Sequence, residues 1–268
     1  MKKLLLSGGF GNQIFQYLGY VKYLDSNGYK RSNGIIDISL LNPFLPLHIK
    51  RNLELDKLIE IETKLNQKKL ITELEYLFLK KIPLIKKHTP FIFDSYQDIN
   101  LIDINDLKLK RDVEKKIIEK SNYYKNNNIN VVMHLRFGDY LDNKKTSSIH
   151  GVLKPEYYLK SLKNLKNKTE YKKILVISDD PINARLAISK IKQSIVAEFL
   201  VVNSKYMLDD FIALCSVQNK IIANSSFSYW AAMIGDVLMP CSNNVVYPKK
   251  WFAKGESPNI FPKHWKNI

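Results

Sequence analysis

The sequence predicts an α/β protein made of two Rossmann-like domains that face a central cleft. Three features of the 268-residue chain support this prediction. Short apolar runs of strand length alternate with longer segments whose apolar residues recur at helical spacing. Glycine-rich or small polar turns follow directly on several of these runs. A polar, asparagine-rich stretch at 125–130 separates two such series, which places the domains at 1–128 and 129–268, with a last helix that can return to the first domain.

The first domain is expected to open with a strand, a glycine turn, a helix and a second strand. Leucines at 4–6 form the first strand, and Asn27-Gly28 is a C-cap signal for the helix. Proline cannot continue a helix, so Pro83 should end a later one. The expected strands are 4–6, 34–38 and 90–96, and the expected helices are 14–24, 70–79 and 112–123.

The second domain repeats this alternation. Pro155 and Pro181 suit the first turn of a helix, and Asp180 is well placed as the N-cap of the second of these helices. A long loop is expected between the first strand of this domain and Gly151. The expected strands are 131–134, 174–177, 199–202 and 220–223, and helices are expected from 155, from 181, at 208–216 and at 229–235.

The composition is that of a globular protein, because 45% of the residues are apolar and 11% are aromatic. The chain has 42 basic and 26 acidic residues, and its net charge of +16 would attract an anionic small ligand, a nucleic acid or an anionic membrane surface. The lysines are spread in pairs without a basic tail, which favours a solvated exterior with weak attraction to membranes. A nucleic-acid or membrane-surface binding protein stays open as an alternative that predicts steeply salt-dependent association, although no aromatic-basic RNA motif supports it.

Cys215 and Cys241 are the only cysteines, so the sequence offers neither a disulfide framework nor the spacing of a metal site. This usage favours a reducing compartment. The apolar run at 4–6 is too short for the core of a signal peptide, and no run approaches the roughly 20 apolar residues of a membrane helix. We therefore expect a soluble or peripheral cytoplasmic protein.

The most informative stretch is the strand at 131–134 with the polar residues that follow it. His134, Arg136 and Asp139 lie within six residues. Ligands of α/β sheets bind outside the carboxyl ends of strands, and residues two apart on a strand share a face, so His134 and Arg136 can touch one ligand. Arg136 is one of five arginines in a lysine-rich chain, and its planar fork suits a phosphate; the alternative is one more surface cation. We expect Asp139 to brace the loop or orient Arg136 rather than to bind a ligand.

Two further turns have the character of anion sites, because helix N-termini present unpaired N–H groups and the positive end of the helix dipole. One ends a buried strand and opens a helix at 224–228. The other lies where the first helix begins and comprises Gly9, Phe10, Gly11 and Asn12. The structural alternatives are a serine N-cap and a tight turn capped by Asn12. With the Arg136 strand end, these turns fit a nucleoside diphosphate held across a two-domain cleft.

Three acidic positions admit both a structural and a functional interpretation. Asp210 lies in the first turn of a helix, where it either interacts with the helix end or accepts the paired donors of a guanine edge. Asp37 ends the second strand and could bind a ribose, although Ile14 stands where the dinucleotide pattern has its third glycine. An NAD-dependent oxidoreductase is thus the alternative function. Asp179 points to the same end of the sheet as the other motifs.

Three blocks of the sequence resemble the α-1,2-fucosyltransferases of glycosyltransferase family 11. The block at 8–17, Gly-Gly-Phe-Gly-Asn-Gln-Ile-Phe-Gln-Tyr, is similar to their N-terminal signature. The block at 134–140, His-Leu-Arg-Phe-Gly-Asp-Tyr, resembles their His-x-Arg-Arg-Gly-Asp-Tyr motif. The block at 222–232, preceded by Leu214-Cys215, is similar to their third motif. The blocks follow the order of the family.

The resemblance implies a GT-B fold and an inverting, metal-independent transfer of L-fucose, or a close 6-deoxyhexose such as colitose, from its GDP-sugar. The implied acceptor is the 2-hydroxyl of a terminal galactose, on a glycan that can be lipid-linked, in surface polysaccharide or O-antigen synthesis. No cofactor and no nucleic acid are implied, and the enzyme would act in the cytoplasm, with peripheral contact at the inner membrane. Arg136 would hold the β-phosphate, His134 the guanosine part and Asp210 the guanine. The remaining donor contacts would come from Gly9, Phe10, Gly11, Asn12, Ser225, Ser226 and Phe227.

The chain departs from the family motif at Phe137, which replaces its second arginine. Successive strand residues face opposite sides, so Phe137 should point away from Arg136 into packing. Phosphate binding can survive this change, but the preference among donor sugars stays open. Arg136 is expected to stabilise the departing GDP. Asp139 and His150 are the candidate bases for the proton of the attacking hydroxyl, with late proton transfer without a dedicated base as the alternative.

Overall fold

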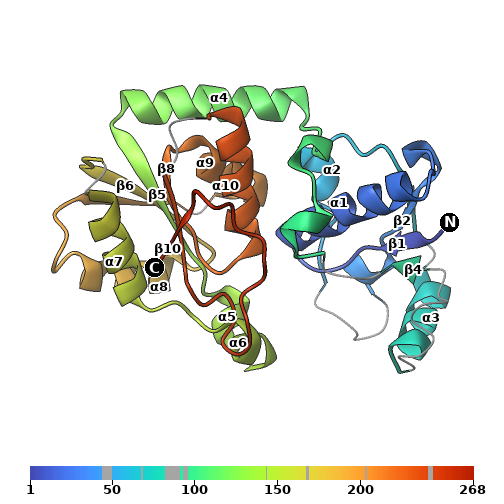
Figure 1. Ribbon diagram of the computed structural model, residues 1–268. Coiled ribbons are helices and arrows are strands. Elements are labelled where there is room, and N and C mark those ends of the chain that lie inside the picture. The colour runs from blue at the N-terminus through green and yellow to red at the C-terminus, as the bar shows by residue number, and fades with distance from the viewer. Residues whose placement is uncertain are drawn as a thin grey trace. The chain divides into compact units, whose positions relative to one another are not determined.

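The computed structural model describes residues 1–43, 50–67, 69–81, 91–92, 96–142, 144–166, 169–202, 204–240 and 244–268, with the backbone alone at 69–71, 79–81, 101, 139, 142 and 144–146. The chain divides into two compact units, Met1–Lys110 and Arg111–Ile268 (Figure 1). Each unit holds its own parallel sheet with helical crossovers. The predicted α/β class, with two units built on parallel sheets, is therefore confirmed.

The first unit contains a four-stranded sheet in the order β3-β2-β1-β4, and all of its strand pairs are parallel. The strands are β1 (Lys3–Leu5), β2 (Ile35–Asp37), β3 (Lys64–Asn66) and β4 (Phe91–Ile92). The helices are α1 (Phe10–Ser26), α2 (Leu55–Leu58) and α3 (Lys69–Lys81), with 3₁₀ turns at Arg31–Asn33, Ser39–Leu41, Ile99–Leu101 and Ile104–Asp106. The predicted stop at Pro83 and most of the exit loop after β4 lie outside the described residues.

Helix α1 begins earlier than its apolar spacing indicated. Gly9 is its N-cap residue and Phe10 its first helical residue, so the glycine turn delivers the chain directly into the helix. Asn12 is a helical residue and not the cap. The predicted C-terminus is confirmed, because Asn27 is the C-cap and Gly28 follows in the left-handed conformation, with φ of 69°.

The second unit contains a six-stranded parallel sheet in the order β10-β9-β8-β5-β6-β7. Its strands are β5 (Ile129–Leu135), β6 (Lys173–Ser178), β7 (Glu198–Val202), β8 (Asn219–Ile221), β9 (Asn244–Tyr247) and β10 (Lys266–Asn267). Strand β5 pairs with β6 on one side and with β8 on the other. The carboxyl ends of these three strands are therefore neighbours at one edge of the sheet.

Helices cover both faces of this sheet. Helices α4 (Arg111–Asn126), α9 (Met207–Ser216) and α10 (Ser226–Leu238) pack together on one face (Figure 1). Helices α7 (Pro155–Lys166) and α8 (Pro181–Ile191) pack on the other. The stretch predicted as one long loop instead contains the short helices α5 (Gly138–Asp142) and α6 (Lys144–His150).

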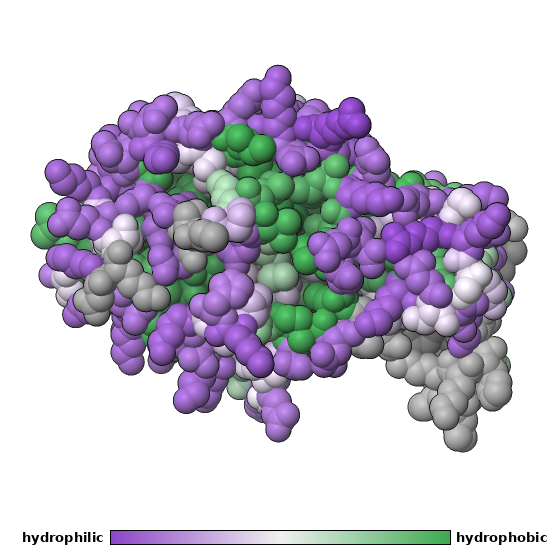
Figure 2. All heavy atoms as spheres, turned by 45° about the horizontal axis from the view of Figure 1, so that its top comes forward, coloured by the Kyte–Doolittle hydropathy of each residue, from purple (hydrophilic) through white to green (hydrophobic). Residues whose placement is uncertain are grey.

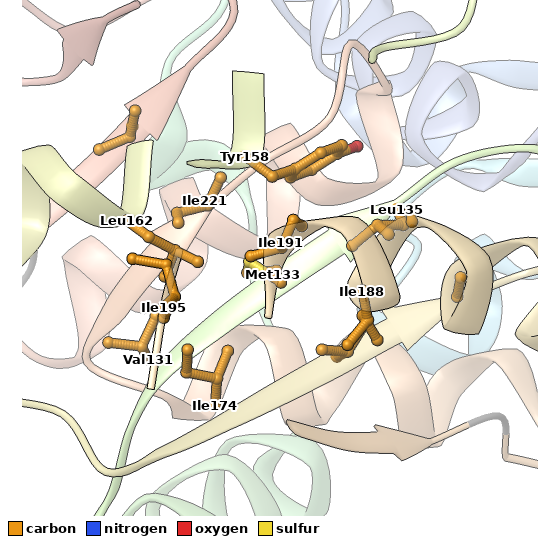
Figure 3. Close-up of a cluster of buried hydrophobic side chains, with 14 of the residues drawn as sticks. Val131, Met133, Leu135, Tyr158, Leu162, Ile174, Ile188, Ile191, Ile195 and Ile221 are labelled. Carbon is orange, nitrogen blue, oxygen red and sulfur yellow. The ribbon is translucent and has the colours of Figure 1, made fainter. Parts of the chain in front are cut away.

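The packing of β5 decides which of its side chains are left for a ligand. Val131, Met133 and Leu135 point into an apolar cluster with α7 and α8 (Figure 3). Side chains alternate along a strand, so His134 points to the opposite face, toward α9 and α10. Phe137 belongs to the same cluster and is 8% exposed, which confirms that it points into packing.

Asp180 caps α8 as the sequence predicts. One oxygen of its carboxylate accepts hydrogen bonds from the backbone N–H groups of Ile182 and Asn183, at 3.1 and 3.0 Å. These hydrogen bonds lower the pKa of the carboxyl, and Pro181 occupies the first turn, where its missing N–H costs nothing.

The division between the units falls at 110/111, whereas the sequence placed it at 128/129. Helix α4 belongs to the second unit, because Val113, Ile117 and Tyr124 on it are buried and it packs against α9 and β5. The polar stretch at 125–130 is the tight connection from α4 to β5 rather than a linker. The expected return of a last helix to the first unit is also corrected, since β10 pairs with β9 and keeps the chain in the second unit.

The surface of the protein is lysine-rich and solvated, as the spread of lysines along the sequence indicates. Hydrophilic residues cover most of the face drawn in Figure 2, and Lys115 and Lys116 on α4 have 78% and 59% of their side chains exposed. Within the described ranges, no helix combines the length and the apolar character needed to cross a bilayer.

Candidate active site

The side chain of Arg136 lies at the carboxyl edge of the second sheet, directly after β5. Its Nη1 forms an ion pair with Oδ2 of Asp179 at 2.9 Å, and its Cζ lies 5.4 Å from the ring centroid of Tyr140. Asp179 follows β6, the neighbour of β5 in the sheet. The ion pair holds the Arg136 side chain in place, and 23% of that side chain is exposed to solvent.

The carboxylate that braces Arg136 is therefore Asp179, whereas the sequence favoured Asp139 for this role. Asp139 lies in the first turn of α5, and its side chain is outside the described residues. Asp179 also accepts the backbone N–H of Phe137 at 2.9 Å through Oδ1. It thereby fixes both the side chain of Arg136 and the peptide that follows it.

His134 is a buried imidazole, only 3% exposed, beside the guanidinium. Its ring lies 5.6 Å from that of Phe227 at the start of α10, and Phe227 in turn packs edge-on against Phe211 of α9. Burial, reinforced by the charge of Arg136, lowers the pKa of His134 to about 3. Its Nδ1 is buried and has no hydrogen-bond partner in the part of the chain that the structure describes.

We expect His134 to stay neutral throughout the physiological range, because a pKa of about 3 keeps the imidazole unprotonated above pH 5. An NMR titration of its Cε1–H resonance, assigned with His134→Gln, should show no titration step between pH 5 and 8. A midpoint near 6.5, the ordinary value for histidine, would contradict the burial and charge argument.

The turn after β8 leads into the N-terminus of α10. Ser225 is the N-cap residue, but its side chain makes no capping hydrogen bond, so the serine N-cap expected as the structural alternative is not formed. Ser226 and Phe227 are the first two helical residues. Their position gives the 225–227 turn the geometry of an anion site.

Asn224, which directly precedes this turn, is buried at 2% exposure and anchors it through hydrogen bonds. Its side-chain amide donates to the carbonyls of His150, Gly151 and Trp251, at 2.8, 3.3 and 3.2 Å. Its own carbonyl accepts the hydroxyl of Tyr140 at 2.9 Å. One buried asparagine thus joins the 225–227 turn to Tyr140 and to the end of α6.

The ring of His150 packs among aromatic side chains. It stacks on Tyr140 with 4.9 Å between centroids and 10° between planes, and it lies 5.6 Å from the ring of Phe252. These ring contacts fix the position of His150 beside Tyr140. The role of His150 as a base stays a prediction.

Asp210 lies in the first turn of α9 and is 9% exposed. It accepts the backbone N–H of Ser204 at 3.1 Å, and burial raises the pKa of its carboxyl. A buried carboxylate is unfavourable without hydrogen-bond donors. Asp210 is therefore suited to take further donors from a ligand, and the Phe211–Phe227 contact places its helix end beside the 225–227 turn.

The residues predicted at the first glycine turn belong to the other unit. Gly9 has an extended backbone before α1, and Phe10 and Gly11 are buried. Oδ1 of Asn12 accepts Nε2 of Gln97 at 3.3 Å. Their contact with a donor stays a prediction from the resemblance.

Asp37, the residue that suggested a ribose site, is used within the fold. Its carboxylate is 1% exposed and accepts the N–H of Ser39 at 3.0 Å. It also accepts Nδ2 of Asn66 and Oγ1 of Thr72, both at 3.2 Å. These hydrogen bonds join β2 to its neighbouring segments. Because the carboxylate is already used within the fold, the alternative of an NAD-dependent oxidoreductase receives no support.

Together, a fixed guanidinium, a neutral buried imidazole and a helix N-terminus form a candidate anion site at the carboxyl edge of the second sheet of this α/β protein. Among the described residues, no group of three or more histidine, cysteine, aspartate or glutamate side chains is arranged to hold a metal ion. The Glycosyl transferase family 11 model matches residues 5–268. The chain thus belongs to glycosyltransferase family 11 and is a glycosyltransferase.

Two curated relatives come from Escherichia coli. The O-antigen biosynthesis glycosyltransferase WbnK is 26% identical over 98% of this chain and 99% of its own length. An alpha-1,2-colitosyltransferase is 30% identical over 52% of this chain and 47% of its own length. Among solved structures, POFUT1 in complex with GDP-fucose is similar at 12% identity and a TM-score of 0.48, over 92% of this chain and 97% of that one.

Proposed function

We propose that this glycosyltransferase transfers L-fucose, or a close 6-deoxyhexose such as colitose, from its GDP-sugar to the 2-hydroxyl of a terminal galactose in surface polysaccharide or O-antigen synthesis. The observation that carries the proposal is the Arg136 guanidinium, fixed by Asp179 beside the neutral His134. The names of the two E. coli relatives, an O-antigen glycosyltransferase and an alpha-1,2-colitosyltransferase, support the proposed pathway and linkage.

In this proposal the second unit binds the nucleotide. Arg136 holds the β-phosphate, and the N-terminus of α10 at Ser225, Ser226 and Phe227 adds backbone N–H groups. Asp210 accepts the two adjacent N–H donors of guanine. His134 contacts the guanosine part through its unpaired Nδ1, where a hydrogen bond would relieve the cost of about 1–3 kcal/mol of a buried unsatisfied group.

The proposed reaction inverts the donor carbon. The acceptor hydroxyl oxygen attacks C1 from the face opposite the diphosphate, the bond from C1 to the phosphate oxygen breaks, and its electron pair leaves with GDP. Negative charge grows on the β-phosphate as this bond breaks, so Arg136 binds the transition state more tightly than the ground state. The acceptor proton passes to a base, for which Asp139 and His150 are the proposed candidates, or late to solvent.

Phe137 bears on the choice of donor sugar. Its side chain lies in the core with α7 and α8, so it cannot make the contact that a second arginine at this position would make. Without the cation of that second arginine, the preference between the two proposed donors, GDP-fucose and GDP-colitose, stays open. We also propose that the enzyme acts at the cytoplasmic face of the inner membrane, where its net charge of +16 favours anionic lipid.

The test is a transfer assay with GDP-L-fucose, GDP-colitose, GDP-mannose and UDP-galactose, and with lactose as the galactose-containing acceptor. We expect transfer from one of the first two donors, a new bond at O2 of galactose by NMR, inversion at C1 and unchanged activity in EDTA. Thermal-shift measurements should show stabilisation by GDP but not by UDP or NAD. Stabilisation by NAD with no response to GDP would overturn the proposal.

A further inference from the structure

We propose that Asp179 is a positioning residue, which fixes the Arg136 guanidinium where the departing phosphate develops its charge. Its two oxygens make separate bonds, because Oδ2 pairs with Nη1 of Arg136 and Oδ1 accepts the N–H of Phe137, both at 2.9 Å. One carboxylate thus controls both the side chain and the backbone of the strand end. The inference rests on the proposed function, since it takes Arg136 as the phosphate ligand.

The neighbouring glycine makes room for this carboxylate. A Cβ atom at Gly138 would lie 2.3 Å from Oδ2 of Asp179, well inside van der Waals contact. The backbone of Gly138 is outside the left-handed region, so its missing side chain, rather than its backbone freedom, is what the site uses. An alanine at this position would displace the Asp179 carboxylate without removing its charge.

Loss of positioning should affect turnover more than donor binding. A displaced guanidinium still attracts a diphosphate, and removal of the carboxylate also removes a repulsion from that diphosphate, so the two effects on binding offset each other. Stabilisation of the transition state depends on the position of the guanidinium relative to the departing phosphate. A displacement of about 1 Å can lower the rate about a hundredfold. The expected signature is therefore a fall in kcat with little change in KM for the donor.

The experiment compares Asp179→Asn and Gly138→Ala with Asp180→Asn, a matched control at the adjacent acid that caps α8. Initial rates are measured with the GDP-sugar that the wild-type enzyme transfers best. Both test variants should lose about 10- to 100-fold in kcat, with KM for the donor within about threefold of wild type. Asp180→Asn should keep kcat and lower only the thermal stability.

A double-mutant cycle separates positioning from a general structural role. When Arg136 is replaced by lysine, Asp179→Asn should have little further effect on kcat, because the group that it positions is already gone. Equal losses in both backgrounds, or a Gly138→Ala enzyme with wild-type kcat, would overturn the inference. Failure of the proposed function is a different result, namely an Arg136→Lys enzyme whose kcat and GDP affinity equal those of wild type.

Discussion

Replacement of Arg136 by alanine is expected to lower kcat for sugar transfer by about 10²- to 10³-fold, the range found when one preorganised group at a developing oxyanion is removed. The guanidinium is held by its ion pair with Asp179 and lies over the ring of Tyr140. Little reorganisation is then needed when charge grows on the β-phosphate. GDP affinity, measured by calorimetry, should also fall, because a charge-assisted hydrogen bond contributes about 1.5–3 kcal/mol.

Arg185→Ala is the matched control, because Arg185 lies exposed on α8 of the same unit. It should leave kcat and GDP affinity unchanged. Arg136→Lys should fall between wild type and Arg136→Ala, since lysine keeps the charge but not the planar fork. An Arg136→Ala enzyme that folds and transfers sugar at nearly the wild-type rate would contradict the assigned role.

Replacement of Lys220 by methionine is expected to raise the free energy of unfolding by about 3 kcal/mol at pH 7. Lys220 lies in β8 with no exposed surface, and its Nζ has no hydrogen-bond partner within the described residues. Burial lowers its pKa from 10.5 to about 8, against the attraction of Asp236. Methionine has a similar length and would fill the same space beside Gly235 without the cost of a buried charge.

The stability difference should depend on pH in a defined direction. Because the pKa of Lys220 is lower in the folded state, the unfolded chain binds more protons between pH 8 and 10.5. The buried charge of Lys220 therefore lowers the free energy of unfolding by its full amount below pH 8. This loss of stability shrinks between pH 8 and 10.5 and disappears above pH 10.5. The free energy of unfolding of the wild-type enzyme should therefore approach that of the variant as the pH rises. Titration of the buried Cys215 and of the tyrosines affects both proteins alike, so it cancels in the difference.

Urea unfolding followed by tryptophan fluorescence can measure this difference, because Trp230, Trp251 and Trp265 all lie in the second unit. Lys172→Met, at an exposed lysine, is the control and should change stability little at any pH. A Lys220→Met protein that is less stable than wild type at pH 7, or a difference that does not shrink toward pH 10.5, would contradict the prediction.

The parts of the fold that depend on local sequence could be predicted. The apolar run before His134 and the cap at Asp180 are signals within a few residues, and both elements are where the sequence placed them. Alternation along a strand was enough to predict that Phe137 enters the core. The convergence of polar strand ends also follows from the general rule for parallel sheets.

The pairing of side chains could not be predicted, because it depends on the order of strands. Asp179 reaches Arg136 since β6 lies beside β5, and nothing local distinguishes this acid from Asp139 as the brace. The unit boundary was misplaced for a similar reason, as tertiary packing of α4 outweighs the linker-like composition after it. The two-residue strand β10 has no periodicity that a sequence could reveal.

The hydrogen bonds of Asn224 have a consequence for how the protein is made. The Asn224 amide that anchors the 225–227 turn donates to the carbonyl of Trp251, which a ribosome adds only after the whole of α10 and β9. A nascent chain that has already formed β5, β6 and β8 therefore still lacks one of the hydrogen bonds that anchor the 225–227 turn. In the proposed assignment, the donor-binding turn is therefore completed only late in synthesis.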